Sequence, residues 1–259
     1  MQEKEILLKG GNITGVVRIG QTVHRTTGPW STAVHGLLQH LEAQGFEGAP
    51  RFLGFDQLGR EILSFIEGEI GTYPLQGYMW SDESLGEVAG FLRRYHDATI
   101  GYRAPHGATW QLEYPDHRQH EVICHNDVAP YNMVYKDKNP HGLIDWDTAG
   151  PGPRLWDIAY AVYRFIPLSY ALDMQELGLT DLATQARRLR LFSQTYGLAL
   201  PYQAILDGVE RRLDALCTLL LERAHDPVYR KMIDEGHLDH YRHDIVFLQR
   251  QRTQLEYLL

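Results

Sequence analysis

One stretch of the chain, between Val122 and Asp157, constrains its fold more than any other. Two short apolar runs, 122–124 and 133–135, bracket a polar loop that reads C-H-N-D-V-A-P-Y-N. A third apolar run, 142–144, leads directly into the acidic sequence D-W-D. Short apolar runs bounded by turn residues predict buried strands. We therefore expect neighbouring strand ends that present carboxylates and an amide together, a group that can hold a divalent cation and orient a hydroxyl.

The polar residues of this stretch have the spacing of a phosphotransfer site. His125, Asp127 and Asn132 are separated by 127 − 125 = 2 and 132 − 127 = 5 positions, as in the protein-kinase loop H-R-D-x-x-x-x-N. Such chemistry needs a carboxylate that receives the hydroxyl proton, and oxygen ligands for Mg²⁺. Asp127 is placed for the first role, and Asn132 and Asp145 for the second. We expect His125 to hold the loop by hydrogen bonds, and Asp147 to support either the metal or the loop.

These residues resemble the aminoglycoside phosphotransferase and choline kinase-like family, whose pattern is H-x-D-x-x-x-x-N followed by I-D-W-[DE]. The blocks P-R-L-W-D-I-A-Y and L-G-E-V-A-G-F-L-R-R-Y-H-D, the second containing His96, resemble further parts of that family. The resemblance implies an α+β, two-lobed protein-kinase-like fold with a small antiparallel N-terminal sheet and a mostly helical C-terminal lobe. It also implies that Asp127 is the catalytic carboxylate, that Asn132 and Asp145 bind magnesium, and that Asp157 is structural.

The first part of the chain predicts the small sheet together with a single helix. Five β-prone runs lie there, at 6–9, 14–19, 22–26, 50–55 and 61–65. Ser31 is expected to cap a helix that ends near Gly45. Apolar residues at helical spacing dominate the later chain, where we expect Ser81 and Thr180 to cap two helices and Gly197 to close the second.

We assign residues 1–67 to a nucleotide-binding lobe and 68–259 to a catalytic and acceptor-binding lobe. The turn at Gly10 and Gly11 would let backbone N–H groups approach a phosphate, although any tight turn uses such glycines. The backbone of Phe65, Ile66 and Glu67 is expected to form the hinge that meets the nucleotide base.

One departure from the family pattern concerns the phosphate-binding cation. Family members usually carry a strand lysine paired with a glutamate on the following helix. The third strand here reads T-V-H-R-T, which makes Arg25 the expected substitute, and Val34 or His35 stands about where the glutamate would fall. Arginine keeps the positive charge but presents a planar fork instead of a point charge.

The composition of the chain limits the kinds of partner that it can bind and the compartment in which we expect it. A net charge of −8 over 259 residues argues against a nucleic-acid partner, because phosphate contacts need clustered Lys and Arg. Cys124 and Cys217 both lie in apolar runs, which predicts buried free thiols in a reducing compartment. Neither a signal-peptide core nor an apolar run of roughly 20 residues is present in the sequence, so we expect a cytoplasmic protein with no membrane partner.

The first functional hypothesis is a magnesium-dependent kinase that moves the γ-phosphate of ATP or GTP onto a hydroxyl of a small molecule. Aminoglycoside-like compounds and amino-alcohol or sugar metabolites are both open as acceptors, and the acidic balance would suit a cationic one. Four acidic residues of the C-terminal helices could meet such a cation, but plain surface charge is the better interpretation of each: Asp207, Glu210, Asp214 and Glu222.

Three other interpretations compete with that hypothesis. A kinase-like nucleotide-binding or regulatory protein with little or no transfer activity is the main alternative, supported by the missing strand lysine. A protein kinase is disfavoured, because only 157 − 145 = 12 positions separate Asp145 from Asp157 and leave no room for an activation loop. A hydrolase metal site is disfavoured because it leaves Asn132 and the N-terminal lobe unexplained; it would be built from His125, Asp127, Asp145 and Asp147.

Overall fold

The computed structural model describes residues 4–8, 16–169, 181–197 and 200–259. The chain folds into two compact units, Met1–Tyr73 with Phe91–Arg154, and Pro74–Gly90 with Leu155–Leu259, which we call the first and the second unit. The predicted turn at Gly10 and Gly11 lies outside the described residues. The lobe boundary between residues 67 and 68 stays a prediction.

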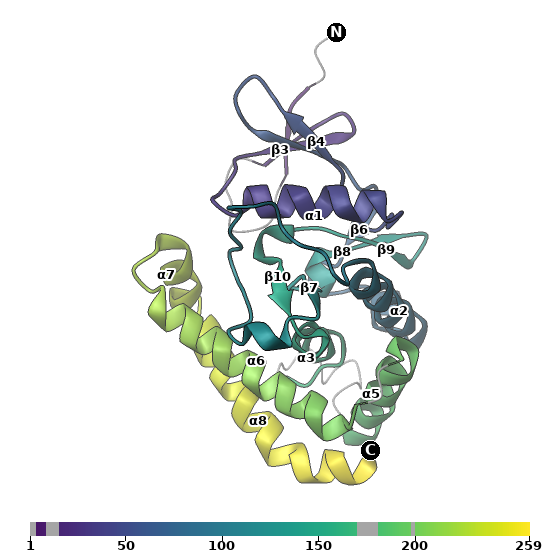
Figure 1. The fold of residues 1–259 in the computed structure, drawn as a ribbon. Helices are drawn as coiled ribbons and strands as arrows, with labels where there is room; N and C mark the ends of the chain where they lie inside the picture. The colour runs from purple at the N-terminus through teal and green to yellow at the C-terminus, as the bar shows by residue number, and fades with distance from the viewer. Residues whose placement is uncertain (1–3, 9–15, 170–180, 198–199) are drawn as a thin grey trace. The chain divides into compact units, whose positions relative to one another are not determined.

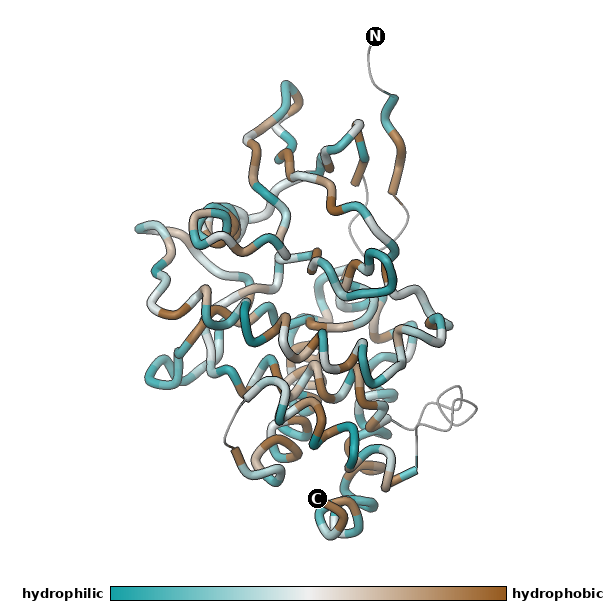
Figure 2. Tube along the Cα trace, turned by 90° about the vertical axis from the view of Figure 1, so that its right-hand side faces the viewer, coloured by the Kyte–Doolittle hydropathy of each residue, from teal (hydrophilic) through white to brown (hydrophobic). Residues whose placement is uncertain are grey.

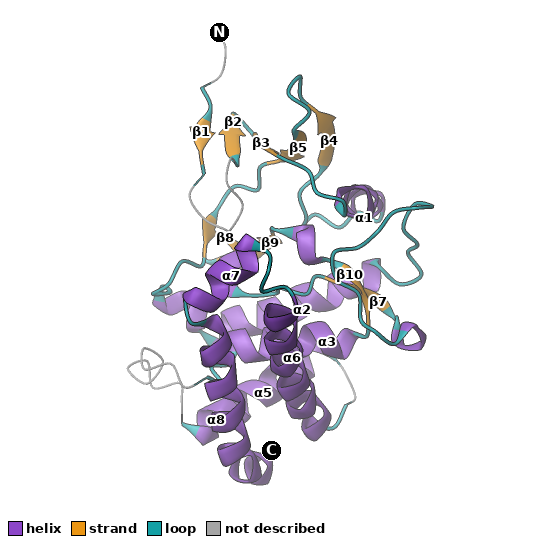
Figure 3. Cartoon of the chain, turned by 90° about the vertical axis from the view of Figure 1, so that its left-hand side faces the viewer, coloured by secondary structure: helices purple, strands orange, loops and turns teal. Residues whose placement is uncertain are grey.

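A five-stranded antiparallel sheet opens the first unit (Figures 1 and 3). In spatial order its strands are β1 (Ile6–Leu7), β2 (Val17–Ile19), β3 (Thr22–Arg25), β5 (Glu61–Ser64) and β4 (Phe52–Phe55). The β-prone runs predicted at 50–55 and 61–65 are confirmed as the antiparallel pair β4 and β5. Pairing of β3 with β5 sets Arg25 directly opposite Glu61, which places a cation and an anion side by side.

Helix α1 (Ser31–Ala43) packs against this sheet (Figure 1). Its apolar face is fully buried and consists of Val34, Leu37, Leu38 and Leu41. The prediction that Ser31 caps the helix is wrong by one position, because Trp30 is the N-cap residue and makes no side-chain capping bond. The Ser31 hydroxyl instead accepts the N–H of Gly28 at 3.0 Å, which stabilises the turn before the helix.

Two small antiparallel sheets build the central stretch of the first unit. One pairs β7 (Val122–Cys124) with β10 (Gly150–Gly152), and the other orders β6 (Glu69–Ile70), β8 (Met133–Lys136) and β9 (Asn139–Leu143). The apolar runs predicted at 122–124 and 133–135 are therefore strands, as expected. Short 3₁₀ helices lie in the connections of the first unit, at η2 (His117–Gln119), η3 (Pro130–Asn132) and η4 (Trp146–Thr148), and η1 (Gly77–Trp80) lies in the second unit.

The second unit is helical. Its helices are α3 (Arg154–Phe165), α5 (Leu182–Tyr196), α6 (Tyr202–Glu222), α7 (Pro227–Asp234) and α8 (His237–Leu258), with α2 (Asp82–Ala98) running from this unit into the first. Helices α6 and α8 lie side by side (Figure 1). Hydrophobic and hydrophilic residues alternate along these helices (Figure 2), as expected of helices that each bury one face.

Two of the three caps predicted for these helices are confirmed. Ser81 accepts the N–H of Ser84 at 3.1 Å, and Gly197 closes α5 with a left-handed φ of 74°. The third is wrong, because the N-cap of α5 is Asp181, whose carboxylate accepts the N–H of Thr184 at 2.9 Å; Thr180 lies outside the described residues.

An N-terminal antiparallel sheet followed by a mostly helical C-terminal part confirms the predicted fold class. Both cysteines are buried free thiols, as predicted. Over the described ranges, no helix has the length and apolar character needed to cross a membrane.

A buried arginine links three segments of the second unit. Arg188 of α5 donates to the backbone carbonyls of Trp80 at 2.9 Å and Phe165 at 3.1 Å, and to the carboxylate of Asp82 at 2.9 Å. Its side chain is only 2% exposed. The preceding residue, Arg187, also pairs with Asp82, but its side chain is 51% exposed.

We expect Arg188→Leu to lower the free energy of unfolding by about 2–4 kcal/mol, because the two carbonyls would lose their buried donor. Arg187→Leu is the matched control and should cost less than about 1 kcal/mol, because its ion pair is exposed to solvent. Urea denaturation of the two variants checks this difference. Equal losses would contradict the structural role given to Arg188.

Candidate active site

The loop between β7 and β8 is held by its own histidine. His125 is fully buried, and its Nε2 lies 3.1 Å from the carbonyl oxygen of Ile144, just beyond β9. Its Nδ1 accepts the backbone N–H of Asp127 at 3.3 Å, so the ring proton resides on Nε2. His125 therefore connects the loop to the end of β9, as the sequence predicted.

The Asp127 carboxylate is oriented by two donors from the same loop. Its Oδ1 accepts the phenol O–H of Tyr131 at 2.6 Å, and its Oδ2 accepts the side-chain amide of Asn132 at 2.8 Å. Because the amide nitrogen of Asn132 faces Asp127, its Oδ1 is the atom left for a metal ion. Tyr131 was not singled out in the sequence, although its position four residues after Asp127 in a turn of η3 indicates such a contact.

Asp145 is presented by a left-handed turn. Its φ is 64°, a conformation that costs energy for a residue other than glycine and that is common at functional sites. The next residue, Trp146, is 1% exposed and donates its indole N–H to the carbonyl of Leu143 at 2.8 Å, which anchors the turn. The Asp145 side chain itself stays 44% exposed, so its carboxylate remains accessible.

Three carboxylates and one guanidinium interact at this site, which gives it a surplus of negative charge; they belong to Asp127, Asp145, Asp147 and Arg25. Partial burial and the neighbouring charge of Asp147 raise the pKa of Asp145 to about 6; Arg25 opposes this shift and Asp127 adds to it. Because solvent still reaches almost half of the side chain, screening moderates the effect. A divalent cation would relieve the repulsion between these carboxylates.

The donor set fits the protein's share of a magnesium site. Magnesium usually takes one or two carboxylates together with substrate phosphates and water, and it seldom occupies a cage made wholly of protein. In the described part of the chain, no three His, Cys, Asp or Glu side chains are arranged to hold a metal by themselves. Asn132 and Asp145 would therefore hold the ion together with the phosphates of a nucleotide.

Arg25, on β3, is the cation of the site and is held between carboxylates. Its Nε donates to Glu61 at 2.5 Å and its Nη2 to Asp147 at 2.5 Å, while Nη1 lies 3.7 Å from Asp145. Burial alone would lower the pKa of Arg25, but the charges of Asp147 and Glu61 outweigh it and raise the pKa. The structure thus brings Arg25 together with Asp145 and Asp147, and assigns Asp147 a contact that supports the loop.

Glu61 is a second site residue, besides Tyr131, that the sequence did not single out. The family pattern places the partner of the strand cation on the following helix, but here the partner lies on β5, opposite Arg25. Its second oxygen accepts a hydrogen bond from Nε2 of His35 on α1. A glutamate inside the short apolar run E-I-L-S was the available signal, because a buried strand carboxylate needs a partner.

The residues predicted to form the hinge connect β5 to β6. The N–H of Phe65 is already used, since it donates to the carbonyl of Gln21 at 2.9 Å. The guanidinium of Arg18 lies 3.6 Å from the centre of the Phe65 ring and covers it. A contact of Phe65, Ile66 or Glu67 with a nucleotide base stays a prediction.

Two of the acidic residues considered for a cationic acceptor are already paired. Asp207 and Glu210 on α6 lie 2.6 Å and 2.8 Å from the guanidinium of Arg252 on α8. Both belong to the second unit and serve to join two of its helices. This pairing agrees with the interpretation of these carboxylates as surface charges.

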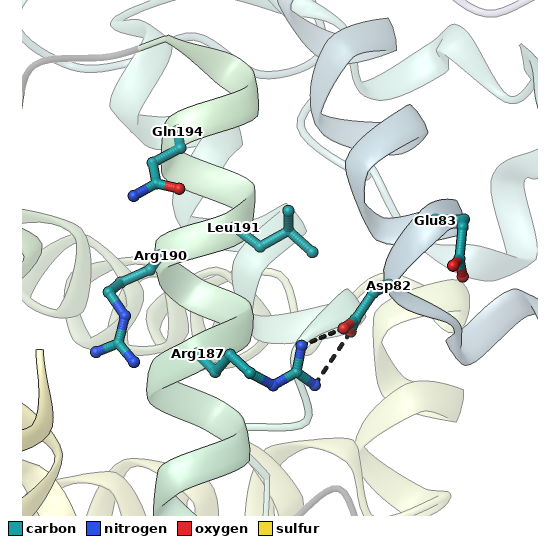
Figure 4. Close-up of a pocket in the computed structure, with 6 residues that line it drawn as sticks. All are labelled: Asp82, Glu83, Arg187, Arg190, Leu191 and Gln194. Carbon is teal, nitrogen blue, oxygen red and sulfur yellow. Dashed lines mark hydrogen bonds and ion pairs between the residues drawn. The ribbon is translucent and has the colours of Figure 1, made fainter.

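The second unit also carries an open pocket of about 480 Å³ (Figure 4). The side chains that line it are Asp82, Glu83, Arg187, Arg190, Leu191 and Gln194. Both of its arginines have partners, because Arg187 forms an ion pair with Asp82 and Arg190 donates a hydrogen bond to the carbonyl of Leu258. The pocket contains none of the residues of the candidate active site.

We expect Glu61→Gln to melt at a lower temperature at pH 7 and to lose less stability in acid. Burial alone would raise the pKa of Glu61, but the hydrogen bond from His35 and the charge of Arg25 hold it below its ordinary value of 4.5. Such a carboxylate stabilises the fold above its ordinary pKa, and that contribution is lost as the pH falls through the lowered pKa. The wild type should therefore lose more than the variant between about pH 5 and 3.

Thermal melting across that pH range checks the expectation. Glu42→Gln is the control, because Glu42 is a half-exposed residue of α1 whose pair with Arg51 lies at the surface. A Glu61→Gln variant whose melting temperature falls as steeply in acid as that of the wild type would contradict the ion-pair assignment.

The chain is similar in sequence to known proteins. Residues 77–192 match the phosphotransferase enzyme family (APH). The trifolitoxin immunity protein of Rhizobium leguminosarum bv. trifolii is 42% identical over 201 residues, which is 75% of this chain and 75% of the relative.

Solved structures with the same fold share little sequence with this chain. The ethanolamine kinase Pv091845 of Plasmodium vivax superposes with a TM-score of 0.66 at 10% identity, covering 98% of this chain and 84% of that one. The amicoumacin kinase hAmiN, in complex with AMP-PNP, Ca²⁺ and Ami, gives 0.62 at 12% identity, covering 93% and 87%. The predicted resemblance is confirmed: this chain belongs to the phosphotransferase enzyme family.

Proposed function

We propose that the protein is a magnesium-dependent kinase that transfers the γ-phosphate of ATP or GTP to a hydroxyl group of a small molecule. The observation that carries the proposal is the grouping of Asp127, Asn132, Asp145 and Arg25 within one compact unit. This group combines a carboxylate for the hydroxyl proton, two oxygen ligands for a metal and one buried cation. Phosphoryl transfer needs these parts and little covalent chemistry from the protein.

In the proposed reaction, Asp127 accepts the proton of the acceptor hydroxyl. The acceptor oxygen forms a bond to the γ-phosphorus, the bond from that phosphorus to the β–γ bridging oxygen breaks, and the nucleoside diphosphate leaves with the electron pair. Tyr131 and Asn132 each donate to one oxygen of Asp127, which holds the carboxylate plane in a single orientation. When bound by Asn132 and Asp145, Mg²⁺ would neutralise phosphate charge, and Arg25 would add a fixed positive charge.

The names of relatives suggest more than one class of acceptor. Ethanolamine kinase is a fold neighbour named for an amino alcohol, and amicoumacin kinase and spectinomycin phosphotransferase are neighbours named for other compounds. The relative with 42% identity is named for immunity to trifolitoxin. We therefore propose a screen of nucleotide consumption against amino alcohols, sugars, aminoglycosides and toxin-like compounds, with ATP and GTP in parallel. A complete lack of acceptor-stimulated turnover, with no thermal shift on adding nucleotide and Mg²⁺, would sink the proposal.

A second candidate function is nucleotide binding without transfer. The observation that favours it is that Nε and Nη2 of Arg25 already donate to Glu61 and Asp147. Only Nη1, which lies 3.7 Å from Asp145, is then placed to meet a phosphate. A protein of this kind would bind nucleotide with Mg²⁺ yet show no turnover with any acceptor of the screen. Phosphorylated product that depends on Asp127 would rule it out.

We expect Asp127→Asn to lower the rate of phosphoryl transfer by about 10²–10⁴-fold, because the amide cannot receive the hydroxyl proton. Binding of nucleotide with Mg²⁺ should change little, since Asn132 and Asp145 remain. Asp137→Asn is the control: Asp137 is exposed and has a φ of 51° that asparagine tolerates. Steady-state kinetics with the best acceptor of the screen makes the comparison, and an active Asp127→Asn variant would remove Asp127 from the mechanism.

We expect Asp145→Asn to raise the Mg²⁺ concentration needed for nucleotide binding by roughly tenfold or more, because a charged ligand becomes neutral. Titration of Mg²⁺ at constant nucleotide, followed by thermal shift, measures this requirement. The Asp137→Asn variant should titrate like the wild type. An unchanged Mg²⁺ requirement in Asp145→Asn would show that the metal is held elsewhere.

A further inference from the structure

Aromatic packing fixes the orientation of the His35 ring. It lies on α1, is 8% exposed and stacks on Phe52 with ring centroids 3.7 Å apart and an interplanar angle of 12°. Phe55 meets the same ring edge-on at 5.6 Å. Two aromatic neighbours hold the imidazole in one plane, with its Nε2 directed at Glu61.

The Glu61 carboxylate is shared between two donors. It is 1% exposed, and its Oε2 accepts from His35 while its Oε1 accepts from Nε of Arg25. A carboxylate has no proton to give, so the imidazole nitrogen facing it must be the donor. Each oxygen of Glu61 thus has its own partner, and the carboxylate cannot rotate without breaking one of these bonds.

This sharing limits how Glu61 can hold Arg25. Arginine and carboxylate groups frequently form a two-pronged pair in which both oxygens meet the guanidinium. Here His35 occupies one oxygen, so Arg25 pairs through Nε alone and keeps Nη2 for Asp147 and Nη1 near Asp145. Without the His35 donor, Oε2 would be a buried acceptor with a lost partner, and turning toward the guanidinium would restore one.

We infer that His35 is a positioning residue: by occupying one oxygen of Glu61, it directs the guanidinium of Arg25 toward the nucleotide phosphates and the metal-binding turn. This inference rests on the proposed function. It also gives a physical reason for the departure from the family pattern, because a histidine on α1 acts through a strand glutamate where a helix glutamate usually pairs directly with the strand cation.

Calorimetric titration with Mg²⁺ and either AMP-PNP or GMP-PNP tests the inference. His35→Leu keeps apolar packing against Phe52 but removes the donor, and His35→Gln keeps an N–H that can reach Glu61. We expect the nucleotide Kd to rise about tenfold in His35→Leu, as it does when other residues that orient a ligand-binding group through a hydrogen bond are removed. In His35→Gln the Kd should return most of the way to the wild-type value. If His35→Leu does not fold, His35→Asn, with a shorter side chain, serves for the same comparison with His35→Gln.

The chain offers a matched control on β3. His24 precedes Arg25 and points to the opposite face of the strand, where its Nδ1 lies 2.9 Å from Asp56. It is 7% exposed, so His24→Leu removes a similarly buried histidine–carboxylate contact. We expect this variant to melt at a lower temperature but to bind nucleotide with the wild-type Kd.

Each outcome decides between the alternatives. An unchanged nucleotide Kd in His35→Leu, or an equal loss of affinity in His24→Leu, overturns the inference while wild-type binding preserves the proposed function. Equal weakening in His35→Leu and His35→Gln also overturns it, because the donor would then be irrelevant. A wild-type protein that binds neither nucleotide with Mg²⁺ overturns the proposed function and this inference with it.

Discussion

The paired contacts of Arg25 with Glu61 and Asp147 are the interaction on which the candidate active site depends. They join β3, β5 and the turn after β9, and the Arg25–Asp147 pair spans 122 positions of sequence. Because Arg25 is buried, with only 7% of the residue exposed, its charge is tolerated only while these carboxylates compensate it. Removing one of them would leave a buried charge with too few partners, so the strand and the loop hold each other in place.

The loop residues around that contact are arranged by local physical chemistry. His125 ties the loop to the end of β9, and Asp127 is oriented by donors from its own loop, Tyr131 and Asn132. Asp145 keeps a left-handed φ because the buried Trp146 anchors the turn. The resulting site has many oxygen ligands and little positive charge. It therefore suits a nucleotide bound together with a metal ion better than a nucleotide bound without one.

Much of this site could be predicted from the sequence, because its residues are local. His125, Asp127 and Asn132 lie within one loop, so their spacing predicts that they lie close together, and the β-prone runs at 50–55 and 61–65 predict β4 and β5. The partners of Arg25 could not be found in this way, since they depend on how distant strands pair. The wrong caps have a local cause: Ser31 and Thr180 each have a neighbour that takes the capping position, and cap propensity does not separate adjacent candidates.

The most direct test of the account is a crystal structure of the protein with Mg²⁺ and a non-hydrolysable nucleotide. The account predicts a metal ion bound by Asn132 and Asp145 together with phosphate oxygens, Asp127 beside the γ-phosphate but not bound to the metal, and Arg25 still paired with Glu61. A nucleotide bound away from these residues, or a metal coordinated by Asp127 in place of Asn132, would contradict it.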